Sequence, residues 1–600
     1  MKKKCIGIVG GIILLGEVLL LASCGVNSKE GIKEDVNTTT ATQESISIST
    51  PSTSVPEVDL NVNDGEFSIL TEDGAYMKND NVYTIYQGGT YNLVGVLNGK
   101  IEVCVTSANA SGIYDVTLEL NGVTITYDKD SPIYILESTD TEISYDVEIS
   151  AQNGTQNIIN DLREKKSEEE NLGEAAIYSE VDLKLKGKGE LYVYGNYNNG
   201  IHTKDDLKIK NLTLVVNALN NAIKGNDSVT IESGSHTFIS TGGDGIKTSN
   251  SSLSSKENQK GMVTLTGGDI QIFACCDGID SAFDVVISDS VNLSIYTDTY
   301  SSYTEEVFDL SESTTLTSLS FPGGHGGGPG GGQGGPGGSE GNTDKSSHSA
   351  KGIKASNEIN ISGGNIYIKA YDDGIHANND TLIESTNAYG NGIVNISGGE
   401  VIIEASDDGI HADTTINITD NAYINVKKSY EGIEANQIVF DGGTTYVYST
   451  NDAVNAALCG STLTPALYIK NGYVDLDCAS GDTDTIDSNG NVYISGGVTV
   501  IKNRQQGTSS MTGGTLDVDY TVSITGGVLM SFGTWCSEAN VTATKSSSST
   551  LSSGTYTLKD SSGNEIITTT LSASYYGYRL FNKTNDSYTL YKDSSIVVSF

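Results

Sequence analysis

Two short stretches, Asp373-Gly-Ile-His-Ala377 and Asp408-Gly-Ile-His-Ala412, carry the pattern that decides the fold. Both place an acidic residue, a small residue, Ile, a polar residue and a small residue in the same order. Eight further copies, in which the first residue is acidic, Asn or once Lys, are Asn199–Thr203, Asn221–Gly225, Asp244–Thr248, Asp277–Ser281, Lys351–Ala355, Glu431–Ala435, Asp452–Ala456 and Asp484–Ser488. The basic step between copies is 21 to 23 residues, and weaker copies at Pro132-Ile133 and Ala176-Ile177 extend the series to about twelve. Repetition at a fixed period predicts a stack of equivalent units.

The residues between the copies indicate how each unit is built. Val394-Asn-Ile-Ser-Gly-Gly399 and Glu400-Val-Ile-Ile-Glu-Ala405 are short β-like segments, and the first ends in a Gly pair typical of a turn. Three such strands in each period predict one coil of a right-handed parallel β-helix. A leucine-rich repeat would need a Leu and Asn pattern that is absent here, and a propeller blade would need about 40 residues. We therefore expect an all-β fold, a right-handed parallel β-helix of about twelve rungs with three strands per coil.

The N-terminal residues have the pattern of an export signal. Residues 1–24 combine lysines at positions 2–4 with an apolar run, and they end in Leu21-Ala22-Ser23-Cys24. This ending is similar to a bacterial lipobox, so Cys24 is the predicted lipidation site. Residues 25–58 are rich in Ser and Thr and predict a tether. We expect a protein anchored by its lipid on the extracellular face of the cell membrane.

Residues 59–530 form the predicted β-helix. Within it, residues 282–350 are predicted to be an insertion, because residues 322–338 contain twelve Gly and three Pro and cannot pack a core. The repeated element disappears beyond about Gly526. Residues 531–600 therefore predict a small cap of short antiparallel strands on the open end of the stack.

The composition excludes a nucleic-acid binder. Lys and Arg number 35 against 76 Asp and Glu, which gives a net charge of -41. Phosphate contacts need basic patches, and a chain of this sign does not supply them.

Stacking turns each repeated residue into a column, because equivalent residues of successive coils lie about 4.8 Å apart. The column of turn residues is acidic from Asp373 onward, and neighbouring carboxylates would repel by roughly 3 kcal/mol per pair at an effective dielectric near 20. A hard cation with several oxygen ligands reverses this repulsion, so we expect bound Ca²⁺. The predicted ligands are Asp372, Asp373, Asp407, Asp408, Glu431, Asp452, Asp482, Asp484 and Asp487. The alternative is a structural column, in which Asp and Asn side chains bond the backbone of the turn, and Asn199 and Asn221 favour it.

A second column faces outward, since Ile410 and Ala412 point inward and His411 between them points out. His376 and His411 occupy this column on successive coils, close enough for a transition metal or for acid–base chemistry. The predicted ligand-binding residues are His376, His411, Tyr367, Tyr371, Glu434 and Asn455.

The repeated element, with Gly89-Thr-Tyr-Asn-Leu-Val-Gly95, Leu118-Glu-Leu-Asn-Gly-Val-Thr-Ile-Thr126, residues 196–206 and the Gly-rich insertion, resembles one family over residues 60–600. It is similar to the calcium-binding β-helix carbohydrate-binding-domain proteins of anaerobic Gram-positive bacteria, which are related in fold to pectate lyases. The resemblance implies binding of pectic acid (polygalacturonate) and cellulose. Calcium would reconcile an acidic polymer with an acidic protein, because one cation can share carboxylates of both.

Two other functions remain open. A calcium-dependent polysaccharide lyase would need a base, for which Lys224, Lys247 and Lys354 are candidates, although an arginine of the pectate-lyase kind has no counterpart on the rungs. Clustered aspartates would suit a polygalacturonase-like hydrolase. A non-catalytic adhesin or structural surface protein is the third class. We expect a binding protein and no enzyme.

Overall fold

The structure is a computed structural model that describes residues 61–164, 173–297, 349–504, 513–534, 543, 545–582 and 587–600. The predicted signal with Cys24, the tether and the Gly-rich residues 322–338 lie outside the described residues. Every regular element within the described ranges is a β-strand, which confirms the all-β prediction. Among these residues no helix is long and apolar enough to cross a membrane.

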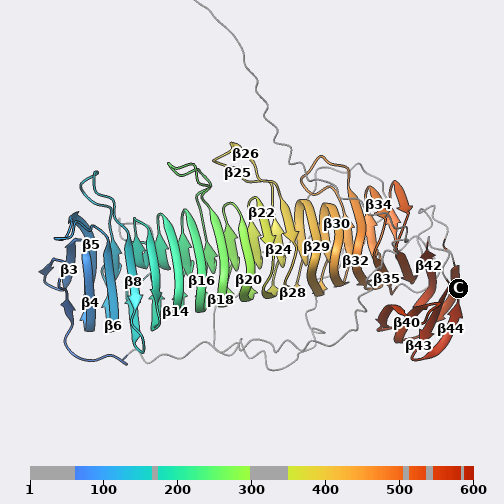
Figure 1. Cartoon of the computed structure of the whole chain (residues 1–600), viewed down its shortest axis with the longest axis horizontal. Helices are drawn as coiled ribbons and strands as arrows, with labels where there is room; N and C mark the ends of the chain where they lie inside the picture. The colour runs from blue at the N-terminus through green and yellow to red at the C-terminus, as the bar shows by residue number, and fades with distance from the viewer. Residues whose placement is uncertain are drawn as a thin grey trace, which may run out of the picture. The chain divides into compact units, whose positions relative to one another are not determined.

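The first strands include the antiparallel pairs β1–β4 and β2–β3. Their bounds, with those of the parallel strands that follow, are β1 (Ser68–Leu70), β2 (Tyr76–Asn79), β3 (Val82–Gln87), β4 (Gly89–Asn98), β5 (Lys100–Ser107) and β6 (Val116–Tyr127). From β5 onward the chain builds coil on coil, and Figure 1 shows these coils in sequence order from blue to orange.

The repeated elements form one continuous column of parallel strands, here called the first column. After β5 it contains β7 (Ile133–Ile135), β10 (Ala175–Ser179), β13 (Asn199–Thr203), β15 (Ile223–Gly225), β17 (Ile246–Lys247), β19 (Ile279–Ser281), β21 (Ile353–Ala355), β24 (Ile375–Ala377), the starts of β29 (Ile410–Ser429) and β30 (Ile433–Ser449), β31 (Val454–Ala456), β33 (Ile486–Ser488) and β36 (Asp517–Val518). The weaker copies at residues 133 and 177 therefore belong to the series, as predicted.

Two further columns complete each coil. Their strands are β8 (Val147–Ala151), β9 (Gln156–Asp161), β11 (Leu183–Gly187), β12 (Glu190–Gly195), β14 (Asp206–Ala218), β16 (Ser228–Ser240), β18 (Met262–Ala274), β20 (Val285–Thr297), β22 (Glu358–Ile361), β23 (Asn365–Ala370), β27 (Ile393–Ile396), β28 (Glu400–Ala405), β32 (Ala466–Cys478), β34 (Asn491–Ile494), β35 (Val498–Asn503), β37 (Thr521–Ile524) and β38 (Val528–Phe532). Long strands such as β14, β16 and β18 bend through both columns, and each pairs in parallel with the coil before and after. Three parallel strands per coil are present, and the right-handed sense of the coil stays a prediction.

The core runs along the inside of the stack. The Ile of the repeated element faces inward in every copy that has one, and in register: Ile353 lies opposite Ile375, which lies opposite Ile410. These three side chains are fully buried. Each coil thus contributes a few apolar side chains, and a core forms only because neighbouring coils cover them.

The insertion was predicted to begin at residue 282, which is earlier than the structure allows. Residues 285–297 form β20, which pairs in parallel with β18 on one side and with β22 and β23 on the other. Its apolar positions Val285, Ile287 and Leu293 are buried, so it is an ordinary part of a coil. This strand could not be recognised from the repeat, because the next copy of the repeated element appears only at Lys351, beyond the Gly-rich residues.

One copy of the repeated element was not identified, although its coil lies within the predicted β-helix of residues 59–530. Asp517 and Val518 of β36 pair in register with Asp487 and Ser488, and Gly514 bridges Asp484. In this coil Gly514 stands where the clear copies of the element have an acidic residue, Asn or Lys, which hides the element in the sequence.

Three longer loops follow strands of the first column and touch one another outside the stack. They comprise residues 248–261, residues 378–392 and residues 457–465, here called the loop ridge. Ser385 N donates to Ser251 O (3.1 Å), and Asn379 Nδ2 donates to Gly460 O (3.1 Å). The middle loop contains the hairpin of β25 (Leu382–Ile383) and β26 (Ala388–Tyr389), which projects from the coils in Figure 1.

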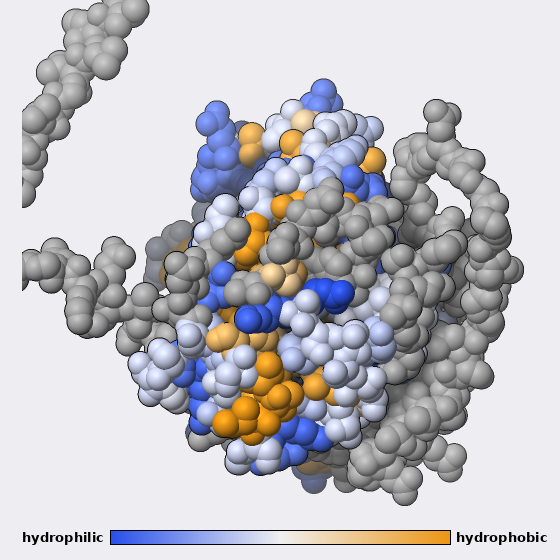
Figure 2. Space-filling view, turned by 90° about the vertical axis from the view of Figure 1, so that its right-hand side faces the viewer, coloured by the Kyte–Doolittle hydropathy of each residue, from blue (hydrophilic) through white to orange (hydrophobic). Residues whose placement is uncertain are grey.

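The C-terminal residues form short antiparallel strands, as predicted. β42 (Tyr575–Asn582) pairs with β38 of the last coil and with β39 (Lys545–Leu551), while β40 (Gly554–Asp560), β41 (Glu565–Leu571), β43 (Tyr588–Lys592) and β44 (Ser595–Ser599) form a separate four-stranded sheet. Tyr575 Oη donates to Asp477 Oδ1 (2.9 Å), which ties this region to the coils. Figure 2 views this end, where hydrophobic side chains gather on the surface, and β44 exposes Ile596 and Val597.

The small second residue of the repeated element is required by close approach between coils. A Cβ at Gly409 would lie 2.5 Å from Gly432 O of the next coil and 2.6 Å from Val426 Cγ1. Ala453 occupies the same position in a later copy and is fully buried. At Gly409 itself, a side chain can be accommodated only if the neighbouring coil shifts.

We expect Gly409→Val to lower the free energy of unfolding by about 1–3 kcal/mol, because two further methyl groups overpack the contact between coils. Thermal and urea unfolding followed by circular dichroism measure this. Ala453→Gly, the matched change at an equivalent position, is expected to cost no more than about 1 kcal/mol. Equal unfolding midpoints for Gly409→Val and the parent would contradict the packing argument.

Candidate functional site

The outward residues of the first column align in register along the whole stack. Beginning with Tyr134 and Tyr178, this outward column reads His202, Lys224, Lys247, Asp280, Lys354, His376, His411, Glu434, Asn455, Asp487 and Asp517. Neighbours in parallel strands lie about 4.8 Å apart, so each charged side chain is in reach of the next. The column places cations in its first half and carboxylates in its second half.

The turn residues beside this column form a hydrogen-bonded ladder. Asn199 Oδ1 accepts the backbone N–H of Asn221 (3.1 Å), and Asp373 Oδ1 accepts that of Asp408 (3.1 Å). Asp452 Oδ1 likewise accepts the backbone N–H of Asp484 (2.6 Å). Asn and Asp serve equally well as acceptors, which explains their exchange in this column. These hydrogen bonds to the backbone occupy one carboxylate oxygen of Asp373 and one of Asp452. The second oxygen of each remains for other contacts.

Lysines neutralise the acidic residues of the earlier coils. Lys247 Nζ lies 2.7 Å from Asp244 Oδ2 and 2.6 Å from Asp280 Oδ2. Burial alone would lower the pKa of Lys247, but the two carboxylates raise it above its ordinary value. Lys354 Nζ lies 3.5 Å from Asp277 Oδ2. Repulsion between the carboxylates of these coils is therefore compensated by the chain itself.

Three of the predicted calcium ligands, Asp372, Asp373 and Asp407, lie together in one such compensated cluster. Lys351 Nζ lies 2.8 Å from Asp372 Oδ2 and 2.5 Å from Asp373 Oδ2. Burial would raise the pKa of Asp373, yet Lys351 and His376 hold it well below its ordinary value. Lys351 was not predicted as the partner of these carboxylates, because it occupies the turn position, outside the outward column.

The remaining predicted ligands lie in coils without such lysines. Within the described residues, Glu431, Asp452, Asp484 and Asp487 form no ion pair with Lys or Arg, and Asp482 is exposed at the edge of the same group. Asp408, Glu431 and Glu434 offer carboxylate oxygens within 4.8 Å of one another. Within the described residues no lysine or arginine pairs with these carboxylates, although His411 contacts Asp408 and Glu434.

Burial and mutual repulsion raise the pKa values of four of these carboxyl groups. Burial, followed by Glu434, raises the pKa of Glu431 to about 9. Burial, followed by Asp517, raises the pKa of Asp484 and of Asp487 to about 7. The pKa of Asp452 is also raised well above its ordinary value by burial and by Asp487. Asp517, which lies beside Asp484 and Asp487, was not among the predicted ligands.

Asn455 Oδ1 and Asp484 Oδ1 are among the buried oxygen atoms of these coils that accept no hydrogen bond from the described residues. The amide of Asn455 is oriented by donating from Nδ2 to Glu431 Oε2 (3.0 Å) and Glu434 Oε1 (3.1 Å). Carboxylate and amide oxygens are the ligands that Ca²⁺ prefers. The donor set from Glu431 to Asp517 therefore fits a hard cation.

The two predicted aromatic residues differ in access. Tyr371 is 43% exposed, whereas Tyr367 is 9% exposed and packs in a cluster with Phe273, Tyr296 and Ile402. Only the ring of Tyr371, of these two, offers a face to a sugar.

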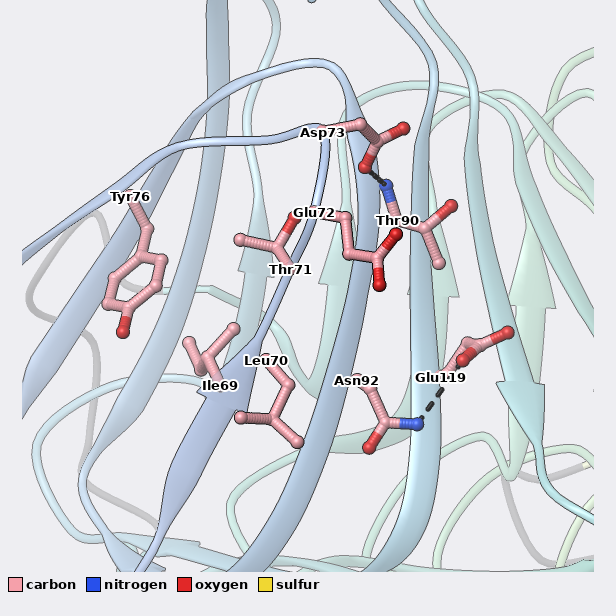
Figure 3. A pocket seen from close by; sticks show the side chains of 9 residues that line it. All are labelled: Ile69, Leu70, Thr71, Glu72, Asp73, Tyr76, Thr90, Asn92 and Glu119. Carbon is pink, nitrogen blue, oxygen red and sulfur yellow. Dashed lines mark hydrogen bonds between the residues drawn. The ribbon is translucent and has the colours of Figure 1, made fainter.

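A polar hollow of about 730 Å³ lies at the other end of the stack, over β1, β2, β4 and β6. Figure 3 shows Asp73 accepting the backbone N–H of Thr90 (3.0 Å) and Asn92 donating to Glu119 (3.2 Å) within it. None of the predicted site residues lines this hollow.

The raised pKa values predict how the calcium-free protein responds to pH. Glu431, Asp484 and Asp487 have folded-state pKa values of about 9, 7 and 7, above the unfolded values near 4. Their contribution to stability is complete below about pH 4 and is lost as the pH rises through about 7 and then 9. The melting temperature in EDTA should therefore fall between pH 5 and 9.

Asp487 provides the control for this prediction. The carboxylates of Asp517, Asp519 and Glu434 lie around it. Asp487→Asn removes one ionisation and should flatten the fall. A melting temperature that rises over this pH range in EDTA would show that the carboxylates are not buried together.

Comparisons with known proteins relate this chain to carbohydrate-binding domain-containing proteins. A family model described as carbohydrate-binding domain-containing protein matches residues 79–390 and 383–482. A protein of Acetivibrio thermocellus with the same description is 35% identical over 137 residues, which are 22% of this chain and 44% of that protein. The chain thus matches less than half the length of this relative. A solved polysaccharide lyase-like protein from C. thermocellum is 36% identical over 37% of this chain and 84% of its own, with a TM-score of 0.32. The family model covers more than half of the chain, which therefore belongs to the carbohydrate-binding domain-containing protein family.

Proposed function

We propose that this protein binds an acidic polysaccharide such as polygalacturonate, without cleaving it, through Ca²⁺ held by the carboxylates of the coils from Glu431 to Asp517. The observation that carries the proposal is that four carboxylates of these coils form no ion pair with lysine or arginine within the described residues: Glu431, Asp452, Asp484 and Asp487. Asp475 and Asp477, in the same coils, do pair with Lys502 and Arg504. Membership of a carbohydrate-binding family makes a polysaccharide the partner. In this proposal the stacked coils are a right-handed parallel β-helix.

Calcium explains how an acidic surface can hold an acidic polymer. Protein carboxylates would occupy part of the coordination shell, and uronate oxygens would fill the rest, since Ca²⁺ takes six to eight oxygen ligands. The loop ridge lies beside the first column, because each of its loops follows a strand of that column. It would bound the face on which a chain of sugars runs along the coils. Cellulose, which has no carboxylates, would have to bind by other contacts, such as the ring of Tyr371.

The test is calorimetric titration of the full chain with Ca²⁺, followed by polygalacturonate in Ca²⁺ or in EDTA. We expect a calcium dissociation constant on the order of 10⁻⁴–10⁻³ M, typical of extracellular sites. Asp484→Asn with Asp487→Asn should weaken Ca²⁺ about tenfold or more and abolish binding of polygalacturonate. Asp280→Asn changes a carboxylate that is already paired with Lys247. This variant should leave the affinity for Ca²⁺ and the binding of polygalacturonate unchanged.

Calcium binding without any affinity for polygalacturonate or cellulose would instead support an adhesin or structural role. No calcium heat at all would remove the proposed mechanism.

The lyase remains the second candidate because of one lysine. Lys247 and Lys354 are committed to ion pairs, whereas burial lowers the pKa of Lys224, a change that favours a general base. Release of unsaturated, ultraviolet-absorbing products from polygalacturonate, and its loss in Lys224→Met, would make this protein an enzyme.

We further propose that Cys24 anchors the protein by a lipid to the extracellular face of the membrane. Expressed in a bacterium with lipoprotein processing, the parent should sediment with membranes and partition into detergent. Cys24→Ser should release it to the soluble fraction, while Cys459→Ser, a distant free thiol, should not. Membrane attachment that survives Cys24→Ser would contradict the lipid anchor.

A further inference from the structure

Two imidazole rings lie face to face at the centre of the outward column. His376 of β24 pairs in register with His411 of β29, and their rings stack with centroids 4.5 Å apart and planes 8° apart. Identical residues on adjacent coils thus place equivalent ring nitrogens side by side. Both side chains are about 15% exposed, so an ion can reach them from solvent.

Each ring is held by a carboxylate of its own turn. His376 Nδ1 lies 2.6 Å from Asp373 Oδ2, and His411 Nδ1 lies 2.9 Å from Asp408 Oδ2. A neutral imidazole that donates its Nδ1–H to a carboxylate keeps the lone pair of Nε2 for a metal, and metal-binding histidines are commonly oriented in this way. The repeated Asp-Gly-Ile-His order produces this arrangement twice.

Asp413 supplies a third donor from the same face. One of its carboxylate oxygens and one ring nitrogen from each of His376 and His411 lie within 4.8 Å of one another. Asp413 Oδ1 is 3.3 Å from His411 Nε2, while Asp413 Oδ2 accepts the backbone N–H of Asn379 (2.7 Å) and is fixed by it. Zinc at about 2.0–2.1 Å from each ligand needs donor atoms about 3.3 Å apart. The stacked rings hold their nitrogen lone pairs nearly parallel, so both imidazoles must turn toward a common point when the ion binds.

The surrounding charges favour a cation at this point. His411 contacts three carboxylates, those of Asp408, Asp413 and Glu434 (3.0 Å from Nδ1). The nearest lysine of the outward column, Lys354, directs its ammonium group to Asp277 and Asp280, on the side of the preceding coils. Lys351 is engaged by Asp372 and Asp373.

We propose that His376, His411 and Asp413 bind one first-row divalent transition-metal ion, with zinc as the representative, and that this site is separate from the proposed calcium site. Two imidazole nitrogens and one carboxylate select such ions, whereas Ca²⁺ prefers oxygen ligands alone. Water can fill the fourth position. The ion would bridge the coils that begin at β24 and β29.

The experiment uses the full chain, stripped with EDTA, dialysed, and titrated with Zn²⁺ in an excess of Ca²⁺. We expect one equivalent of zinc to bind despite the calcium. Titration with Co²⁺ should give the visible absorption bands of a bound cobalt ion with nitrogen ligands. His376→Asn and Asp413→Asn should each weaken zinc at least tenfold and remove the cobalt bands.

Three control variants distinguish this zinc site from neighbouring residues and from the proposed calcium site. Lys354→Gln changes the neighbouring position of the outward column and should keep zinc binding intact. Cys459→Ser should also keep it, although Cys459 lies near His411 and Glu434. Asp484→Asn should weaken calcium but not zinc, so failure of the calcium proposal and of this one are distinguishable. Circular dichroism and melting temperature establish that each variant is folded.

Absence of zinc binding by the folded parent would overturn the proposal and leave His411 as a protonated partner of its three carboxylates. Zinc binding that persists in both His376→Asn and Asp413→Asn, or that Ca²⁺ displaces at equal concentration, would overturn it as well.

Discussion

Parallel pairing in register is the constraint on which the rest of this structure depends. Once coils of 21 to 23 residues stack with Ile on Ile, every outward residue acquires an outward neighbour from the next coil about 4.8 Å away. A charged residue in the repeated element therefore cannot be considered alone. Repulsion between stacked carboxylates is reduced in three ways along the chain. Asn replaces Asp in the first coils, lysines pair with Asp in the middle, and the later coils keep carboxylates whose protons are held tightly.

The sequence was sufficient to predict the parts of the molecule that repeat. The element Asp408-Gly-Ile-His-Ala412 identified the inward Ile, the outward His and the alignment of coils, because all of these follow from a fixed period. The insertion boundary at residue 282 was wrong because β20 carries no copy of the element. The copy of the element at Asp517 was not identified, although its coil lies within the predicted β-helix, because Gly514 replaces the polar or charged residue of the turn.

Side-chain partners were harder to predict than positions. Lys351 reaches Asp372 and Asp373 through a long, flexible side chain, and no periodicity reveals where its ammonium group ends. Asp413 lies one residue beyond the repeated element, so an argument from columns does not include it. Its role depends on the backbone N–H of Asn379, which a loop of the preceding coil supplies. The sequence therefore predicts which residues share a face, whereas the pairing of charges requires the structure.

The loop ridge separates what must stay constant in this architecture from what can vary. Residues 248–261, 378–392 and 457–465 differ in length, yet the coils that carry them remain in register on both sides. Ser251 and Ser385 lie 3.1 Å apart, donor to acceptor, although 134 positions separate them in the chain. A change in the length or sequence of one of these loops is therefore accommodated by the neighbouring loops, and the core stays the same. Proteins built on this stack can exchange the loops that border the proposed binding face while every coil beneath keeps its place, so specificity can evolve without a cost in foldability.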